Sequence, residues 1–332
     1  MSALNQPLVS ILVPVYGVEQ YIERCATSLF EQTYSNIEFV FADDCTPDAS
    51  ISILEHTLSC YPQRQAQSKI LHHQQNRGLS AARNTALDNS AGDYLMIVDS
   101  DDWLVDNTVV STLVERAEKT HADIVVFDFL NIYAHSQSPS YKNIPTNKES
   151  YLKYLLECRC TPSLATSFYK AALFRDNNVR NIEGVDMSED YTVQPRLVYY
   201  ANTIDYLRKP LYCYYRANEH SYINSIKPST SSAIPEVDVI EQFFNDKPDR
   251  GKYQPSIEAA RLLKSARRFV NWAKYSGDLV SYKSIPKFTT PSYLFNSRLM
   301  FKYKIVILLQ RLHLQRLFAA FVRRQWSAVN GQ

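Results

Sequence analysis

The sequence predicts an α/β fold with a mostly parallel sheet and helices on both faces. Three observations predict it. Short, β-branched apolar runs recur along the first 130 residues, and stretches with apolar residues at helical spacing separate them. The runs are apolar throughout instead of alternating, which is typical of strands buried on both faces. Composition agrees, since 45% of the 332 residues are hydrophobic and 21% are charged, as in ordinary folded proteins.

The first elements follow in a regular order. "LVSILVPVY" (8–16) predicts a buried strand that ends near a proline, and 19–32 predicts a helix. "IEFVFADD" (37–44) is the second strand, and residues 48–61 form the second helix, which Asp48 caps. The remaining predicted elements are a weak strand at 69–73, a helix at 80–90, a strand at 93–98, a helix at 106–119 and a strand at 123–129. Strands that alternate with helices of this length indicate βαβ units.

After residue 130 this alternation breaks down. Helix-like stretches at 150–158, 170–177 and 188–200 mix with tyrosine-rich strand-like stretches at 203–208 and 211–216. We interpret residues 131–227 as a continuation that closes over the sheet's edge. Residues 228–256 contain four prolines and predict a connector around one short helix, followed by helices at 256–276 and 294–325. The expected regions are therefore 1–130, 131–227 and 228–332.

Several classes of protein are disfavoured. Seven widely spaced glycines allow neither GxGxxG nor GxxxxGK[ST], so the glycine loops that hold dinucleotides or nucleoside triphosphates are missing and a dehydrogenase is excluded. Six cysteines show no CxxC pair and no zinc spacing, which favours reduced thiols and a cytoplasmic protein. We find neither a signal peptide nor an apolar run long enough for a transmembrane helix.

Acidic residues gather where the predicted strands end. Asp43 and Asp44 end the second strand, and Asp99, Asp101 and Asp102 end the strand at 93–98. Ligands of such sheets lie at the carboxyl ends of the strands. Three carboxylates within four residues repel one another unless a cation intervenes, and Mg²⁺ or Mn²⁺ suits them. The alternative is a helix N-terminus, which accepts one or two acidic residues.

The sequence resembles a known family at three stretches, "VSILVPVYGVEQYIERCATSLFEQTYSNIEFVFADDCTPDAS", "NRGLSAARNTAL" and "YLMIVDSDDWL". Their order and spacing are similar to the donor-binding half of the inverting family-2 glycosyltransferases, which have a GT-A (Rossmann-like) fold. The resemblance covers residues 8–130 and extends weakly to about 220 through "SEDYTVQPRLVYYA" and "YCYYR". It implies transfer of a hexosyl or N-acetylhexosaminyl group from a nucleotide sugar to a hydroxyl.

The resemblance also implies roles for the acidic turn and the second strand. Asp101 would be the direct ligand of Mn²⁺ or Mg²⁺, with Asp99 nearer the ribose as a further metal ligand. Ser100 lies between them in the donor site, and Asp102 supports its neighbours. Asp44 would accept the imide N–H of a uracil ring, so a UDP-sugar is the expected donor.

Other donor-binding residues are expected around the nucleotide. Pro14, Tyr16 and Glu19 end the first strand, where Tyr16 would stack on the base or simply fill the top layer of the sheet. Asn76 and Gly78 belong to the segment that crosses the nucleotide in the resembled family. Two arginines complete the set. Arg83 would reach the diphosphate or pair with Asp99 or Asp101. Arg216 would contact the leaving diphosphate.

"GVDMSEDY" (184–191) supplies the expected catalytic pair. An inverting transfer needs a base for the acceptor hydroxyl, and the resemblance assigns that role to Asp190. The neighbouring Glu189 would raise its affinity for a proton. The alternative is a helix N-terminus capped by Ser188, with two acids favoured by the helix dipole. Both interpretations can hold together.

The end of the chain is basic and apolar. Residues 279–332 contain nine Lys or Arg and no Asp or Glu, interleaved with Leu, Phe and Trp. A basic amphipathic helix at 294–326 would lie on an anionic membrane surface, which predicts a protein on the inner face of the cell membrane. Alternatively, the helix packs on the catalytic body. No nucleic-acid recognition motif accompanies the charge.

Together these features predict a metal-dependent glycosyltransferase of surface polysaccharide synthesis, such as capsule or lipopolysaccharide, with a growing glycan or a lipid-linked acceptor. The rival hypotheses are a non-catalytic nucleotide- or sugar-binding protein on the same fold and a receiver-type signalling domain. The latter would be far shorter and would carry a lysine after the strand at 123–129, where "DIVVFDFLN" has none. The sugar, the acceptor, the linkage and the oligomeric state cannot be derived from the sequence.

Overall fold

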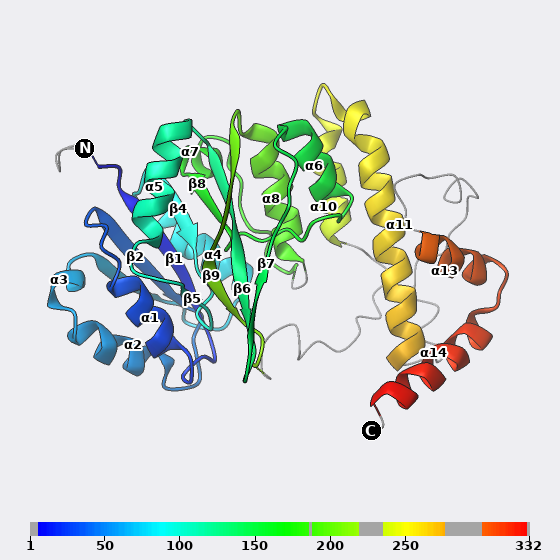
Figure 1. The fold of residues 1–332 in the computed structure, drawn as a ribbon, viewed down its shortest axis with the longest axis horizontal. Coiled ribbons are helices and arrows are strands. Elements are labelled where there is room, and N and C mark those ends of the chain that lie inside the picture. The colour runs from blue at the N-terminus through cyan, green and yellow to red at the C-terminus, as the bar shows by residue number, and fades with distance from the viewer. Residues whose placement is uncertain (1–5, 186–187, 219–234, 276–300, 331–332) are drawn as a thin grey trace. The chain divides into compact units, whose positions relative to one another are not determined.

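A computed structural model describes residues 6–185, 188–218, 235–275 and 301–330 (Figure 1). The chain divides into two compact units. The first comprises Met1–Leu155 with Cys160–Asn218, and the second Leu156–Arg159 with Glu219–Gln332. The predicted boundary at 227/228 lies outside the described residues.

The first unit is built on a nine-stranded sheet with the order β3-β2-β1-β4-β8-β6-β9-β5, and β7 pairs with β6 beside this path. The strands are β1 (Val9–Val15), β2 (Ile37–Asp43), β3 (Ser68–His72), β4 (Tyr94–Ile97), β5 (Trp103–Leu104), β6 (Ile124–Ile132), β7 (Gln137–Ser140), β8 (Ser167–Lys170) and β9 (Ile204–Tyr215). β1 to β4 pair in parallel, as do β6 and β9. β8 is antiparallel to both β4 and β6, and β5 and β7 are also antiparallel to their partners, so the complete sheet is mixed.

The strand directions define one chemically important edge. Because β8 runs antiparallel to β4 and to β6, these two strands point the same way. The carboxyl ends of β1, β2, β4, β6 and β9 therefore meet at a single edge, and the amino end of β8 joins them there. Loops at this edge are the usual place for ligands in α/β sheets.

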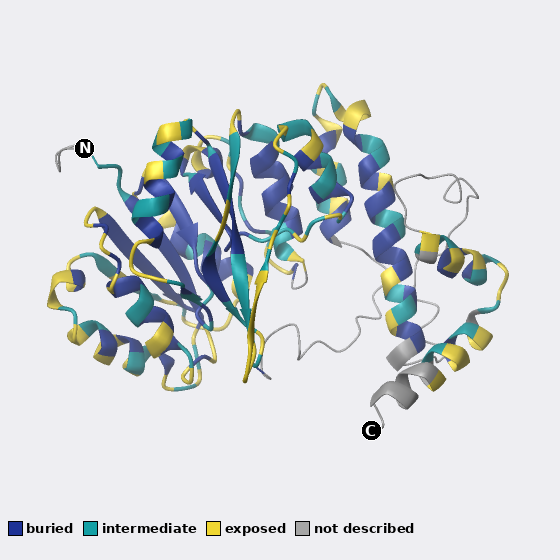
Figure 2. Ribbon diagram, in the orientation of Figure 1, coloured by how far each residue is buried: buried dark blue, intermediate teal, exposed yellow. Residues whose placement is uncertain are grey.

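Helices cover both faces of the sheet (Figures 1 and 2). The helices of the first unit are α1 (Ile22–Phe30), α2 (Ser50–Ser59), α3 (Pro62–Gln65), α4 (Leu79–Asp88), α5 (Val109–Thr120), α6 (Lys148–Leu156), α7 (Ala172–Arg175) and α8 (Glu189–Tyr200). The odd-numbered apolar residues of β1 and β2 share one core cluster with buried residues of α1, α2 and α5. Helix α4 packs on the same two strands, and its alanines are buried outside that cluster. Burial on both faces explains the continuously apolar strands.

The predicted elements of residues 8–129 are confirmed, with ends shifted by a few residues. The expected Asp48 cap of α2 is wrong, because the N-cap is Ala49 and no side chain caps it; Asp48 lies one residue earlier and accepts the backbone N–H of Ser50 at 3.1 Å. The helix predicted at 170–177 is confirmed only as the short helix α7, Ala172–Arg175, and the strand β8, Ser167–Lys170, was not predicted. Four residues are too few to show a periodicity that separates strand from helix. The two predicted strands at 203–208 and 211–216 are one strand, β9, with register shifts opposite Asp128.

The second unit contains α10 (Pro235–Asn245), α11 (Arg250–Tyr275), α13 (Phe301–Arg311) and α14 (Gln315–Asn330). Helix α11 begins six residues before the predicted 256 and includes Pro255. The single helix predicted at 294–325 is wrong. The helix is interrupted between α13 and α14, where His313 has a φ of 56°. Residues 294–300 are not described. Leu263, Phe269 and Trp272 pack with residues of α13 and α14. None of the described helices is long and apolar enough to cross a membrane.

Candidate active site

The three aspartates after β4 have different environments. Asp102 is 1% exposed. Its Oδ2 accepts the Tyr212 hydroxyl at 2.8 Å and its Oδ1 accepts the Tyr215 backbone N–H at 2.8 Å. Burial and the negative charges of Asp101 and Asp99 raise the pKa of Asp102, while these two hydrogen bonds oppose the increase. Asp102 therefore anchors the acidic turn to β9.

Asp101 lies at the open side of the same turn. Its Oδ2 accepts a hydrogen bond from Asn218 Nδ2 at 2.9 Å, and its backbone oxygen accepts one from Arg24 Nη2 at 3.2 Å. The Arg24 guanidinium lies 3.6 Å from the ring centroid of Trp103, which fixes it by a cation–π contact. Burial and the charge of Asp99 raise the pKa of Asp101.

The donor set at this turn fits a hard divalent cation. Mg²⁺ is commonly bound by one or two carboxylates together with substrate phosphates, and Asp99 and Asp101 offer two carboxylates that repel each other. No cluster of three or more His, Cys, Asp or Glu suited to a metal occurs within the described ranges. A protein cage that holds the ion without a substrate is therefore not present in them.

Arg83 connects the acidic turn with the residues predicted to be catalytic. Its side chain, 3% exposed, donates from Nη2 to Asp99 Oδ1 at 2.8 Å. Nη1 donates to Glu189 Oε1 at 3.0 Å and to Asp190 Oδ1 at 3.1 Å. Burial would lower the pKa of Arg83, but the three carboxylates outweigh it and the pKa is raised. Of the two roles left open for Arg83, the structure shows the ion pair, with Asp99 as the partner from the turn.

Asp190 is the second residue of α8 and lies next to this arginine. Its Oδ2 accepts the Leu164 backbone N–H at 3.2 Å. Burial raises the pKa of Asp190 to about 7; Arg83 and the Leu164 hydrogen bond lower it, and the charges of Glu189 and Asp99 add to the increase. Ser188 is the N-cap residue of α8, with a φ of 58°, and Glu189 and Asp190 lie in the first turn, as the alternative interpretation expected, but the Ser188 side chain makes no capping bond. The carboxyl group is thus poised to exchange a proton near neutral pH.

Asp44 lies at the end of β2, where it binds the loop before α4. Its Oδ1 accepts the Arg77 N–H at 2.8 Å, and its Oδ2 accepts the Gly78 N–H at 2.7 Å. His73 Nδ1 also contacts Oδ1 at 2.7 Å. Gly78 has a φ of 88°, which favours glycine, and lies directly before α4. Asp44 therefore shapes the loop that the sequence predicted to cross the nucleotide.

The remaining predicted donor-binding residues lie at the same edge in different settings. Tyr16 is 49% exposed, so it does not fill a buried top layer, whereas Pro14 is buried in β1. Glu19 Oε2 accepts the Ala49 N–H at 3.0 Å, which makes it a support for α2. Ser100 is buried and Asn76 is exposed.

Arg216 follows β9 and is held at the end of β6. Its Nε donates to Asn131 Oδ1 at 2.9 Å, and its guanidinium lies 4.1 Å from the ring centroid of Tyr214.

Sequence reasoning missed several residues that position the site. Asn218 and Tyr212 hold the acidic turn from more than a hundred residues away. Asn181 receives a hydrogen bond from Asn84 Nδ2 on its backbone oxygen at 3.0 Å and donates its N–H to Asn84 Oδ1 at 2.9 Å. Their side chains carry no local signal, because each acts on a partner distant in sequence.

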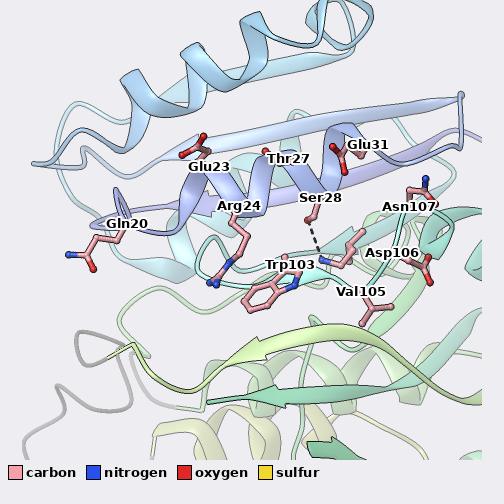
Figure 3. A pocket seen from close by; sticks show the side chains of 11 residues that line it. Gln20, Glu23, Arg24, Thr27, Ser28, Glu31, Trp103, Val105, Asp106 and Asn107 are labelled. Carbon is pink, nitrogen blue, oxygen red and sulfur yellow. Dashed lines mark hydrogen bonds between the residues drawn. The ribbon is translucent and has the colours of Figure 1, made fainter. Parts of the chain in front are cut away.

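A separate pocket of about 490 Å³ lies between α1 and the segment 103–107 (Figure 3). Arg24 and Trp103 lie toward one end, and Glu31 and Asn107 toward the other. None of the predicted site residues lines it. Arg24 connects it with the acidic turn through the backbone oxygen of Asp101, and Trp103 directly follows Asp102 in the sequence.

Solved structures of other proteins share this fold. Staphylococcus aureus TarS residues 1–349, solved in complex with UDP-GlcNAc, matches with a TM-score of 0.67 at 19% identity, over 98% of this chain and 92% of that one. Mannosyltransferase PcManGT from Pyrobaculum calidifontis, in complex with GDP-Man and Mn²⁺, matches with a TM-score of 0.53 at 16% identity, over 96% and 88%. The fold is that of the GT-A glycosyltransferases, as predicted.

The family follows from the sequence comparisons. The model described as "Glycosyl transferase family 2" matches residues 10–182, and the chain belongs to this family. Glycosyltransferase GlyA of Streptococcus pneumoniae is 33% identical over 219 residues, which is 62% of this chain and 30% of GlyA. The uncharacterized glycosyltransferase EpsJ of Bacillus subtilis is 34% identical over 222 residues, 65% of this chain and 62% of EpsJ. The chain thus spans less than two thirds of either relative.

Proposed function

We propose that this protein is an inverting, metal-dependent glycosyltransferase that moves a sugar from a UDP-sugar to a hydroxyl of a growing glycan or lipid-linked acceptor. The observation that carries the proposal is the Arg83 cluster, in which one buried guanidinium joins Asp99 of the acidic turn to Glu189 and Asp190. A donor held at the turn would therefore lie beside a carboxyl group whose pKa is about 7. In this proposal residues 1–130 bind the donor, 131–227 form the acceptor side, and 228–332 form an appended helical region.

Asp101 and Asp99 would hold Mn²⁺ or Mg²⁺, which when bound supplies positive charge to the departing diphosphate. Asn218 and Arg24 position Asp101 for this role. Asp44, with Tyr16, Asn76 and Gly78 around it, would recognise uracil. Support for a uridine donor includes the TarS complex with UDP-GlcNAc, although that likeness concerns the fold.

Asp190 would act as the general base. Its carboxylate would take the proton of the acceptor hydroxyl while that oxygen attacks the anomeric carbon. Glu189 adds negative charge and shares Arg83, so the pair keeps its orientation. Direct displacement in one step inverts the anomeric configuration. Relatives named for polymer synthesis, such as the poly(ribitol-phosphate) beta-N-acetylglucosaminyltransferase TarS, support a role in surface polysaccharide synthesis.

Nucleotide release tests the proposal. Wild type and Asp101→Ala are incubated with UDP-, dTDP- and GDP-sugars in Mn²⁺, Mg²⁺ or EDTA. We expect slow hydrolysis of one UDP-sugar that requires the metal and falls at least a hundredfold in Asp101→Ala, because that variant loses a ligand of the ion. Release that persists in EDTA would contradict the metal role, and release from none of the donors would contradict the proposed activity.

Turnover should depend on pH through Asp190. A base works only when deprotonated, so we expect the rate to rise with pH and to reach half its maximum near pH 7. The groups that set this value are Arg83, Glu189 and Asp99; Lys142, whose own pKa burial lowers to about 8, also interacts with Asp190. Glu189→Gln removes a neighbouring negative charge and should move the midpoint to lower pH. A profile that is flat from about pH 5.5 to 8.5 would exclude Asp190 as the base.

The helices α13 and α14 would hold the protein on the anionic inner face of the cell membrane. Phe301, Ile305, Leu308 and Leu312 recur at helical spacing and are 38–76% exposed, while Ile307 on the other side of α13 is buried. Leu317 and Phe321 repeat the pattern on α14, with exposures of 69% and 62%. Exposed Arg316 and Arg324 accompany them, and each basic residue near an anionic surface contributes about 1 kcal/mol.

Vesicle sedimentation tests this membrane contact. Wild type should sediment with vesicles containing phosphatidylglycerol but much less with pure phosphatidylcholine. Leu317→Glu/Phe321→Glu should abolish binding while nucleotide release is retained. Equal binding to both vesicle types, or unchanged binding of the double variant, would contradict the proposal.

A further inference from the structure

His73 lies outside every role considered so far, yet it is among the most buried polar groups at the ligand edge. Its side chain is 6% exposed and that of Asp44 is 3% exposed. Nδ1 is 2.7 Å from Asp44 Oδ1, and Nε2 is 2.8 Å from the hydroxyl oxygen of Thr85 on α4. The ring thus forms a bridge from the carboxyl group at the end of β2 to the helix that follows the nucleotide-crossing loop.

The bridge occupies part of the hydrogen-bonding capacity of the Asp44 carboxylate. An ionised carboxylate only accepts hydrogen bonds and has about four acceptor positions. Oδ1 uses two of them, for His73 Nδ1 and for the Arg77 N–H, and Oδ2 uses one for the Gly78 N–H. One position remains, on Oδ2. Because the other three are occupied by groups within the protein, the orientation of the remaining one is fixed.

The same contacts define the protonation of the ring. Since Asp44 as a carboxylate cannot donate, Nδ1 carries a proton and donates it to Oδ1. The Thr85 hydroxyl can then donate to Nε2 of the neutral ring. In this arrangement Asp44 accepts each of the three hydrogen bonds given above, from His73, Arg77 and Gly78.

We propose that the His73–Thr85 pair is a positioning device that fixes the orientation of the Asp44 carboxylate, so that the donor site selects bases with an N–H at the pairing edge over bases with a lone pair there. The inference rests on the proposed function, because it assumes that a nucleotide base meets Asp44. Uracil presents N3–H to the carboxylate, whereas cytosine presents an N3 lone pair, which a carboxylate repels. Neither His73 nor Thr85 needs to touch the base.

Calorimetric titration of UDP and CDP in Mn²⁺ tests the pair. Wild type should prefer UDP. His73→Phe should weaken UDP binding about tenfold or more and leave CDP binding unchanged, because a hydrogen bond to a charged group is lost. His73→Asn, whose amide N–H can replace Nδ1–H, should keep most of the preference, and Thr85→Val should lose part of it. His72→Phe is the matched control, since His72 contacts Asp43 and is 55% exposed; it should behave as wild type.

The outcomes distinguish failure of the His73 role from failure of the proposed uridine-binding site. If wild type prefers UDP and His73→Phe, still folded, keeps that preference, the role of His73 is wrong while the donor site stands. If wild type binds neither nucleotide, or binds both equally, the uridine-binding proposal fails and this inference fails with it. Should His73→Phe not fold, Thr85→Val decides the matter, because an unchanged preference for UDP in that variant contradicts the bridge.

Discussion

Asp190→Asn is expected to lower sugar transfer by about a hundredfold to ten-thousandfold while leaving UDP binding within a factor of two of wild type. Asparagine has the size of aspartate, and its amide oxygen can still accept the Leu164 N–H that binds Asp190 Oδ2. It cannot take up the acceptor's proton. The loss should therefore appear in kcat for transfer, measured by nucleotide release with an acceptor present.

The matched control is Glu189→Gln. Glu189 shares Arg83 with Asp190 but only adds charge in the proposed mechanism. We expect it to lose tenfold or less. If Asp190→Asn keeps more than a tenth of wild-type turnover, or if Glu189→Gln is the more damaged variant, Asp190 is not the base.

The second large effect is expected on stability, in Arg83→Met. Methionine removes a guanidinium that pairs with Asp99, Glu189 and Asp190 alike. Removing one member of a buried ion pair costs about 3–5 kcal/mol, because the carboxylates left behind lose their shared counter-charge and, at 16–32% side-chain exposure, are only partly hydrated. We expect the free energy of unfolding of the first unit to fall by about this amount in urea titrations at neutral pH.

Arg77→Met provides the comparison for this measurement. Arg77 pairs with Glu183 at 3.0 Å, but both side chains are nearly half exposed. Such pairs contribute about 0–1 kcal/mol. If both variants lose the same free energy of unfolding, or if Arg83→Met loses none, the buried Arg83 cluster does not stabilise the fold.

The first half of the fold could be predicted because its signals are local. The strands β1, β2 and β4 are short and largely apolar, and α1 and α5 show helical spacing. β8 could not be recognised, because Ser167–Lys170 is too short to show a period and its place between β4 and β6 depends on distant pairing. The break between α13 and α14 was missed for a related reason, since no Gly or Pro marks residues 312–314.

Within the site, the sequence could indicate residue types and strand ends, but not which carboxylate does what. Asp101 and Asp102 are neighbours, and only Tyr212 and Tyr215 of β9 make the latter a buried anchor. The partners of Arg83 are 16, 106 and 107 residues away. The contact between His73 and Asp44 depends on the pairing of β3 with β2, which the sequence alone does not show.

The most direct test of the account is UDP binding to wild type and Asp101→Ala, measured by calorimetry in Mn²⁺ and in EDTA. If the acidic turn holds a cation that bridges the diphosphate, Mn²⁺ should strengthen binding to wild type at least tenfold and should have no effect on Asp101→Ala. UDP binding that is equally tight in EDTA and in the variant would show that the turn does not hold a metal for the donor.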